Sequence, residues 1–599
     1  MGDQQEAEAE HSSPADTHPR RRWLRRTVWV AVALVLLSGA WLAVTGFLAY
    51  RESQTLTANL RAAESAAREA NLSALAAALP EARDSAHRLQ LLTSGPVWWA
   101  AAHVPLVPYV GPSANAVREL ASVGDDLFNA AAPLQQPLQS VAAGNLRTAD
   151  GALNLELLQQ SIPALRETAT AVTQAQQRLS AINTKGLPAR LGKPIKQLRA
   201  QLPTFVPLAN SLADAAERVP PLLGADGPRT WLVLLQNPGE ARGTGGFIGG
   251  YALVTADHGK ITIDKVGAND ELVAHQPIDY SALPADTRSL WGRDLAEWQS
   301  INLSPHFPYT GQLAVQGMKQ IGTTIDGVIA VDPQVVSVLL AATGPAKVGE
   351  RTITADTAVD YVTRQVYVDQ GDSAKKDQAL LSLFTQTLQK LTTGSVDLPV
   401  LMRGLALSVD GHHLQAYSTN KAEQAWLEAT PVGGVISNEP GPHVVIALNN
   451  GAGNKIDAFI HTSAEYQYGH CPGRDYQFSN LNLTLANKAP ADLPNVMNVR
   501  NDDPNAPAAG ERMLVEIYAP GGSFLLEATL NGEPEPIGNG TDRGHPVWRF
   551  VVDVDRGASR TLALKFSEPT VKGATATLQV PAMVVPATVS VTPSTDCAQ

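Results

Sequence analysis

Residues 236–251 read QNPGEARGTGGFIGGY, and this glycine-dense stretch is the most distinctive in the chain. It follows the apolar run WLVLL at 231–235, which has the character of a buried strand. The stretch does not match a dinucleotide-binding fingerprint, because its third glycine is out of register and a strand, not a helix, follows. Glycines here let the backbone approach either an anion or a neighbouring strand. Arg242 suits a bound phosphate or carboxylate, or a structural salt bridge, and both interpretations stay open.

Beyond this stretch, strands alternate with helices. Asp257-His258-Gly259 lies between two apolar strands and predicts a hairpin turn. Residues 327–332 (GVIAVD) predict a buried strand, with Asp332 as the N-cap of a helix that ends at Gly344. Strands alternating with helices predict an α/β sandwich domain, in which helices cover a sheet, over residues 223–435.

The regions on either side have different patterns. Within residues 51–222, apolar residues recur at spacings of three and four, which predicts a helical bundle or stalk. Residues 440–599 contain short strands separated by Gly, Pro, Asn and Asp clusters, which predict a C-terminal β-sandwich. The expected fold class is therefore multidomain α+β, with a transmembrane helix, a helical stalk, an α/β domain and a β-sandwich in that order.

The N-terminal region predicts a membrane anchor. Residues 1–26 form a polar, disordered cytoplasmic tail that ends in clustered arginines. Residues 27–50 are apolar and about as long as the ~20 residues that a bilayer core requires. A cleaved signal peptide would have a shorter apolar region, so we favour an uncleaved helix. Because arginines stay on the cytoplasmic side, we expect a single-pass plasma-membrane protein with an extracytoplasmic body.

A proline-broken apolar segment interrupts the stalk. It runs over residues 96–111 and contains the adjacent pair Trp98 and Trp99. The simpler interpretation is that the segment packs against the helical bundle. The alternatives are that it dips into the outer membrane leaflet or contacts a lipid-linked ligand.

Charge and cysteine content limit the possible partners. The formal net charge is -11, which argues against a nucleic-acid binder. The chain has two cysteines, Cys471 and Cys597. In an oxidising compartment we expect one intrachain disulfide between them, with reduced thiols or a cross-link between chains as the alternatives.

Four runs of sequence are similar to a family of membrane-anchored actinobacterial proteins that share a domain of unknown function. These are residues 236–261 (QNPGEARGTGGFIGGYALVTADHGKI), 302–308 (NLSPHFP), 323–348 (TTIDGVIAVDPQVVSVLLAATGPAKV) and 449–460 (NNGAGNKIDAFI). More distantly, the chain resembles the LytR–CpsA–Psr proteins. Those are single-pass envelope enzymes that move glycopolymers from polyprenyl-pyrophosphate carriers onto the cell wall.

The distant resemblance implies a set of site residues. Arg242 stands where that family has an arginine before its first core strand, and residues 283–288 (LPADTR) resemble its Pro-Arg-Asp-Thr motif. Residues 361–364 (YVTR) and 371–378 (GDSAKKDQ) resemble its tyrosine–arginine helix and the basic segment that follows. The implied residues are Arg242, Asp286, Arg364 and Asp372 for catalysis; Asn237, Gly245, Gly246, Arg288, Lys375 and Lys376 for phosphate binding; and Asp270 and Asp286 for a metal, Mg²⁺.

The chain also departs from that pattern. Ala285 replaces the arginine before Asp286, and Gly245 stands near the position of the expected magnesium-binding aspartate. Lys375 and Lys376 replace arginines and lose their bidentate grip on phosphate. Two hypotheses follow. The protein binds or transfers lipid-linked glycopolymers in envelope or exopolysaccharide assembly, or it is a non-catalytic envelope scaffold that holds polymer or protein partners.

Overall fold

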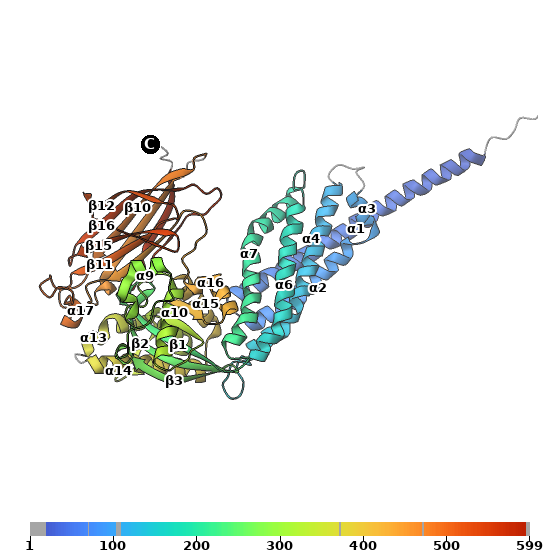
Figure 1. The fold of residues 1–599 in the computed structure, drawn as a ribbon. Helices are drawn as coiled ribbons and strands as arrows, with labels where there is room; N and C mark the ends of the chain where they lie inside the picture. Colours follow the sequence, from blue (N-terminus) through green and yellow to red (C-terminus); the bar gives the residue numbers. More distant parts are fainter. Residues whose placement is uncertain (1–18, 70, 104–109, 371–372, 470–472, 595–599) are drawn as a thin grey trace, which may run out of the picture. The chain divides into compact units, whose positions relative to one another are not determined.

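A computed structural model describes residues 19–69, 71–103, 110–370, 373–469 and 473–594. The chain divides into two compact units. The first comprises residues 1–146 and 154–219, and the second comprises residues 147–153 and 220–599. Helices build the first unit, whereas the second combines helices with several sheets (Figure 1).

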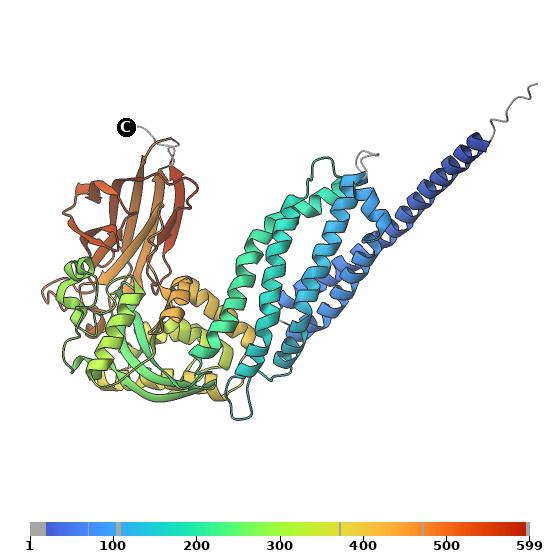
Figure 2. The same cartoon turned by 45° about the vertical axis from the view of Figure 1, so that its right-hand side comes forward.

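The first unit is a bundle of long helices (Figure 2). Its elements are α1 (Pro19–Arg68), α2 (Leu72–Thr93), α3 (Pro96–His103), α4 (Val110–Ala131), η1 (Ala132–Leu134), α5 (Gln135–Ala142), α6 (Leu155–Ala181) and α7 (Ala189–Leu222). Within the described residues, one helix is long and apolar enough to cross a membrane, and it belongs to α1. The expected transmembrane segment and the first stalk helix are therefore one continuous helix.

Small side chains and ion pairs hold this bundle together. Ala116, Ala175 and Ile195 belong to one buried cluster that joins α4, α6 and α7. Arg178 of α6 pairs with Glu119 of α4 at 2.9 Å. The same guanidinium also pairs with Asp126, about two turns further along α4, at 2.7 Å. Asn154 caps α6 by accepting a hydrogen bond from the Leu157 amide. Alanine at the contacts lets the helices approach closely, so a modest apolar core is sufficient.

The second unit begins with a five-stranded sheet in the order β3-β2-β1-β4-β7. Its strands are β1 (Arg229–Arg242), β2 (Gly245–Asp257), β3 (Lys260–Ala268), β4 (Gly327–Val331) and β7 (Leu414–Ser418). β1 and β4 are parallel, and the other neighbours are antiparallel. The helical and small elements around the sheet are α8 (Asn269–Val273), α9 (Ala285–Trp291), η2 (Gly292–Ala296), α10 (Phe307–Gln320), α11 (Pro333–Thr343), β5 (Ala346–Val348), β6 (Arg351–Ile353), α12 (Ala355–Asp360), η3 (Tyr361–Gln365), α13 (Val366–Asp369), α14 (Ser373–Thr393), α15 (Leu398–Asp410), α16 (Lys421–Glu428) and η4 (Pro431–Gly433).

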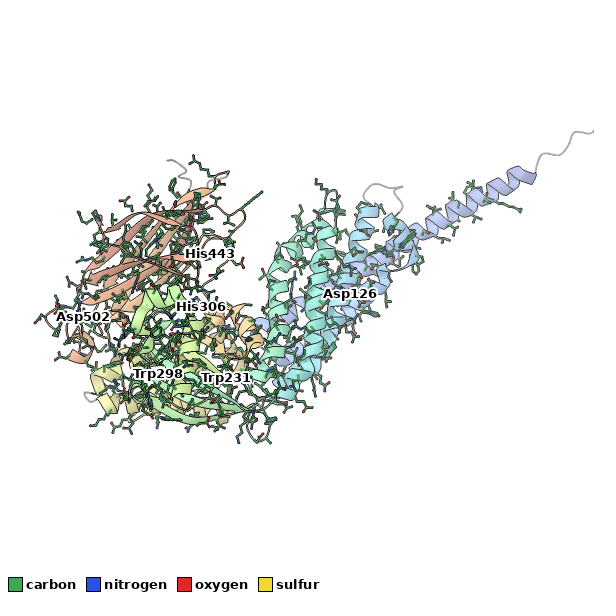
Figure 3. All side chains as sticks on the ribbon, viewed as in Figure 1. Asp126, Trp231, Trp298, His306, His443 and Asp502 are labelled. Atoms are coloured by element: carbon green, nitrogen blue, oxygen red, sulfur yellow. The ribbon has the colours of Figure 1, made fainter. Side chains whose placement is uncertain are left out.

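Alternation along β1 buries this sheet on both faces. Leu232 and Leu234 join one core with residues of α9 and α10, whereas Val233 joins another with residues of α11 and α14. Trp298, labelled in Figure 3, fills the first core, and Gly317 makes room for it. A Cβ at Gly317 would lie 2.4 Å from the Trp298 ring. Helices therefore cover both faces of the sheet.

The C-terminal part of the second unit contains two further sheets. Their orders are β13-β12-β16-β10-β9-β18 and β14-β15-β11-β8-β17. One hydrophobic cluster includes Ile446 and Val515 of the second sheet and Leu483 and Phe566 of the first. The elements are β8 (His443–Asn450), η5 (Asp457–Phe459), β9 (Ile460–Gly469), β10 (Tyr476–Asn487), α17 (Asn495–Asn498), β11 (Glu511–Tyr518), β12 (Phe524–Leu530), β13 (Glu533–Pro534), β14 (Gly538–Asp542), β15 (His545–Val554), β16 (Ser559–Pro569), β17 (Thr577–Gln579) and β18 (Thr588–Ser594).

The α/β part and the C-terminal sheets are joined by buried contacts. Tyr518 of β11 lies in the same hydrophobic cluster as Phe307 of α10. Asp542 of β14 accepts hydrogen bonds from Thr287 of α9 at 2.7 Å and from the Tyr518 hydroxyl at 3.1 Å. Because these side chains are buried, the junction is a continuation of the core.

The expected multidomain α+β organisation is confirmed, with one apolar helix near the N-terminus and several sheets. The hairpin at Asp257-His258-Gly259 joins β2 to β3, and His258 adopts a positive φ of 49° there. Asp332 caps α11 by accepting a hydrogen bond from the Gln334 amide at 2.8 Å. The expected disulfide partners Cys471 and Cys597 lie outside the described residues.

Candidate functional site

The glycine-rich stretch forms the tip of the β1–β2 hairpin, where neighbouring backbone occupies the space that side chains would need. A Cβ at Gly243 would lie 2.0 Å from the Leu303 carbonyl oxygen. A Cβ at Gly246 would lie 2.2 Å from the Asn237 carbonyl carbon. At these two positions glycine is required for close packing of the chain on itself.

Arg242 lies in a buried salt bridge. Its exposed fraction is 8%, and its Nη2 donates to Glu240 Oε1 at 2.8 Å. Its Nη1 donates to the Asn450 carbonyl oxygen at 3.3 Å, and its guanidinium lies 5.5 Å from the Phe247 ring centroid. The sequence allows two roles for Arg242, phosphate binding and a structural salt bridge. The geometry supports the salt bridge.

Glu240 connects the two glycine- and asparagine-rich motifs of the chain. It pairs with Arg242 on its own strand and with Lys455 from the NNGAGNKID segment. Burial by itself would raise the pKa of Glu240, but the charges of Lys455 and Arg242 hold that pKa below its usual value. The buried carboxylate is therefore ionised and bridges two cations.

Two further carboxylates, Asp457 and Glu511, lie beside the triad of Glu240, Arg242 and Lys455. Asp457 Oδ2 accepts hydrogen bonds from the Ala241 amide at 2.7 Å and from Asn450 Nδ2 at 2.9 Å. Asn450 Nδ2 also lies 3.2 Å from Glu511 Oε2. The other oxygens, Asp457 Oδ1 and Glu511 Oε1, are buried without a hydrogen-bond partner. Burial raises the pKa of Asp457 to about 6, and burial together with the charge of Asp457 raises the pKa of Glu511 well above its usual value, so Glu511 favours its protonated form.

Glu511→Gln should raise the stability of the second unit at pH 8 by on the order of 1–2 kcal/mol and change it little at pH 4.5. The folded-state pKa values of this pair are raised, so their stabilising contribution is present below the unfolded pKa near 4 and is lost as pH rises through the folded-state values, of which that of Asp457 is about 6. Glutamine removes that titration, and its amide can donate to Asp457. Thermal unfolding from pH 4.5 to 8 checks this; an unchanged slope, or destabilisation at pH 8, contradicts it.

A cavity of about 270 Å³ opens between the sheet and the helices of its second face. Strands β1 and β2 form one wall, and α11 and α14 contribute the other. Most of its walls are apolar. The apolar lining residues are Leu235, Phe247, Val331, Val336, Val362, Leu380, Leu381, Leu383 and Phe384. A partly open apolar cavity of this size suits part of a hydrocarbon chain or a small apolar ligand.

Charged side chains of both signs also line the cavity, and its two lysines have carboxylate partners. Lys376 lies 3.0 Å from Asp377 and 5.5 Å from the Tyr367 ring centroid. Lys455 pairs with Glu240 and lies 4.9 Å from the Phe247 ring centroid. Because each of these two lysines already pairs with a carboxylate, neither presents an unpaired charge to an anionic ligand. The apolar wall is therefore the dominant feature.

The structure brings some of the expected site residues together and separates others. Asn237, Asp270 and Lys376 line the cavity. Asn237 donates from Nδ2 to the Tyr367 hydroxyl at 3.0 Å, which fixes it in the wall. Gly245 and Gly246 lie in the packed hairpin tip and are absent from the lining, as is Lys375.

The remaining expected residues lie elsewhere in the second unit. Arg364, in the π-helical turn η3, pairs with Asp360 at 2.6 Å on the surface. On α9, Asp286 Oδ2 accepts from the Arg543 amide at 3.1 Å, and Arg288 Nε donates to the Leu283 carbonyl at 3.1 Å. Neither α9 residue nor Arg364 lines the cavity. Asp372 lies outside the described residues.

The carboxylates do not fit a magnesium site among the described residues. Asp270 lines the cavity, whereas Asp286 accepts a hydrogen bond from the turn between β14 and β15, so the two expected ligands belong to different places. In the described part of the chain, no three His, Cys, Asp or Glu side chains are grouped closely enough to hold a metal ion. We therefore derive no step that depends on a metal.

Sequence reasoning missed Lys455, Glu240, Asp457 and Glu511 as a connected group. The NNGAGNKID segment was noted only as part of a resemblance, although its density of Asn, Gly and Asp marks a polar loop that must satisfy its own backbone. Glu511 opens a strand and carries no local signal, because its partner is distant in the sequence.

One family model matches the chain. It covers residues 226–367 and is described as a protein of unknown function (DUF4012). The match supports the shared domain of unknown function that the sequence predicted. It extends from just before β1 to Tyr367 and so includes Asn237 and Asp270 of the cavity, but not Lys376 or Lys455. No curated protein and no solved structure matches the chain.

Proposed function

We propose that this protein is a membrane-anchored, extracytoplasmic binding protein for lipid-linked ligands of envelope or exopolysaccharide assembly. The observation that carries this proposal is the apolar cavity, which a hydrocarbon chain fits better than a free sugar or nucleotide does. The apolar segment of α1 is long enough to cross a bilayer, and lipid-linked ligands are found in membranes. The arginines that precede this segment favour a cytoplasmic N-terminus and an extracytoplasmic body.

Between binding and transfer, the geometry favours binding. Phosphoryl transfer requires its catalytic groups within a few ångströms of the reacting atoms. Arg242 is buried in a salt bridge, Arg364 is paired on the surface, and Asp286 accepts a hydrogen bond from the turn between β14 and β15. These residues do not surround one point, so the non-catalytic alternative has the better support. In that case the LytR–CpsA–Psr resemblance concerns the fold and not the activity. The helices that cover both faces of the sheet support a similar fold. The two C-terminal sheets around one core support the β-sandwich interpretation.

A thermal-shift experiment tests the proposal. The full chain in nanodiscs is melted with a polyprenyl pyrophosphate, with the matching polyprenol and with inorganic pyrophosphate. We expect the lipid pyrophosphate to raise the melting temperature, because a ligand at a hundred times its Kd adds about 2.7 kcal/mol.

The control ligands separate the alternatives. We expect the polyprenol to retain much of this effect and inorganic pyrophosphate to have little. A shift that requires magnesium and the pyrophosphate would favour transfer. No shift with a folded chain would favour a scaffold for protein partners.

A further inference from the structure

The short helix α3 packs on the membrane-spanning part of α1. The Trp98 Nε1 donates a hydrogen bond to Thr45 Oγ1 at 2.9 Å, and both side chains are buried. Gly46 faces the same ring, since a Cβ there would lie 3.9 Å from it. Figure 1 shows α3 beside α1. The simpler sequence interpretation, in which this segment packs on the bundle, holds for Trp98.

The position of Thr45 along α1 gives the depth of this contact. A helix rises about 1.5 Å per residue, so a hydrocarbon core of about 30 Å takes about 20 residues. Counted from Val28, the first residue of the apolar run, that distance ends near Phe47. Thr45 therefore lies in the last turn inside the core, and α3 meets α1 at the membrane boundary.

Three large apolar side chains are exposed at this end of the bundle. The exposed fractions are 62% for Leu91, 55% for Trp99 and 44% for Val110. Trp99 stacks on His103 with ring centroids 4.7 Å apart, which leaves an amphipathic surface that is suited to a lipid headgroup region. Water would not favour such exposure, whereas a membrane interface does.

The turn between α6 and α7 adds positive charge at the same end. Arg178 of α6 pairs with Glu119 in the first half of α4, so the end of α6 lies toward the start of α4, next to α3. The cations of this turn and of the first residues of α7 are exposed, and none forms an ion pair within the described residues; they are Lys185, Arg190, Lys193 and Lys196. Anionic lipid attracts exposed lysines and arginines that lie near its surface.

We propose that α3 and the start of α4 enter the membrane interface, as a second contact that holds the helical bundle against the bilayer. The occupant of the exposed apolar surface is the lipid of the leaflet on the side of the folded body. The proposal rests on the anchor in the proposed function, because the depth of Thr45 has meaning only if α1 crosses a bilayer. It does not depend on what the cavity of the second unit binds.

Depth-dependent quenching tests the proposal on the full chain in liposomes. A fluorophore is attached to Val35→Cys in α1, to Trp99→Cys in α3 or to Gln160→Cys near the start of α6, in a Cys471→Ser, Cys597→Ser background. Nitroxide lipids then quench from shallow or deep positions. We expect deep lipids to quench the label at 35, shallow lipids to quench the label at 99, and the label at 160 to keep its fluorescence.

The outcomes separate this proposal from the anchor on which it rests. Quenching at 35 without quenching at 99 overturns the α3 contact and leaves the anchor standing, and the exposed surface then belongs to a protein partner. No quenching at 35 overturns both. Should the cysteine-free chain not fold, Trp99→Phe in the native chain gives a second test. Interfacial brominated lipids should then quench less of the total tryptophan fluorescence than in the parent, and equal quenching contradicts the proposal.

Discussion

Glu240→Gln should destabilise the second unit by about 3–5 kcal/mol, because breaking a buried ion pair leaves its partners charged and unpaired. Glu240 is 5% exposed and contacts both Arg242 and Lys455, so one substitution strands two cations. Glutamine keeps the size of the side chain, which excludes a cavity as the cause. Thermal unfolding of the full chain measures the loss as a fall of several degrees in the melting temperature of this unit.

The matched control is Arg364→Ala, which breaks a surface pair. Arg364 and Asp360 are four residues apart on one helical turn, and such pairs contribute about 0.3–0.5 kcal/mol. If Glu240→Gln melts no earlier than this control, the triad does not stabilise the junction. Replacing Glu240, Arg242 and Lys455 together by Leu, Met and Met should recover part of the loss, since no charge then remains buried.

Local chemistry made several elements predictable. Asp332 marks the start of α11 and Gly344 marks its end, because an N-cap and a C-terminal glycine act within one turn of the helix. The β2–β3 hairpin follows from the tolerance of His258-Gly259 for positive φ. β7 has no clear local signal, because it pairs with β4, which lies far away in the sequence.

The glycine-rich stretch shows why the candidate site was harder to predict. Glycine is needed wherever a Cβ would clash, and the sequence does not say whether the opposing atom belongs to a ligand or to the protein. At Gly243 that atom is the Leu303 carbonyl oxygen. A Cβ at Gly249, in the same stretch, would lie 4.0 Å from its nearest non-neighbouring atom, the Leu235 carbonyl oxygen. Gly249 also lines the cavity. The cavity-lining glycine is therefore part of the motif, whereas the resemblance points instead to Gly245 and Gly246, which do not line the cavity.

Gly249→Leu should weaken binding of the lipid-linked ligand by about tenfold or more while the chain stays folded. The added side chain begins in the cavity wall and occupies space that an apolar chain would use, and overfilling costs about 1–3 kcal/mol. Gly249 lies in β2 with ordinary backbone angles, where leucine is at least as favourable as glycine. The substitution should therefore leave the melting temperature of the free protein unchanged or raise it slightly.

Gly249→Ala is the matched control, because one methyl group at the same position takes up much less of the cavity. The thermal shift with polyprenyl pyrophosphate should be near the parent value for alanine and much smaller for leucine. This order follows from volume alone and not from charge, since neither variant alters Lys376 or Lys455. If leucine binds as tightly as the parent, the ligand lies outside this cavity, and the apolar wall is then part of the core and not a binding surface.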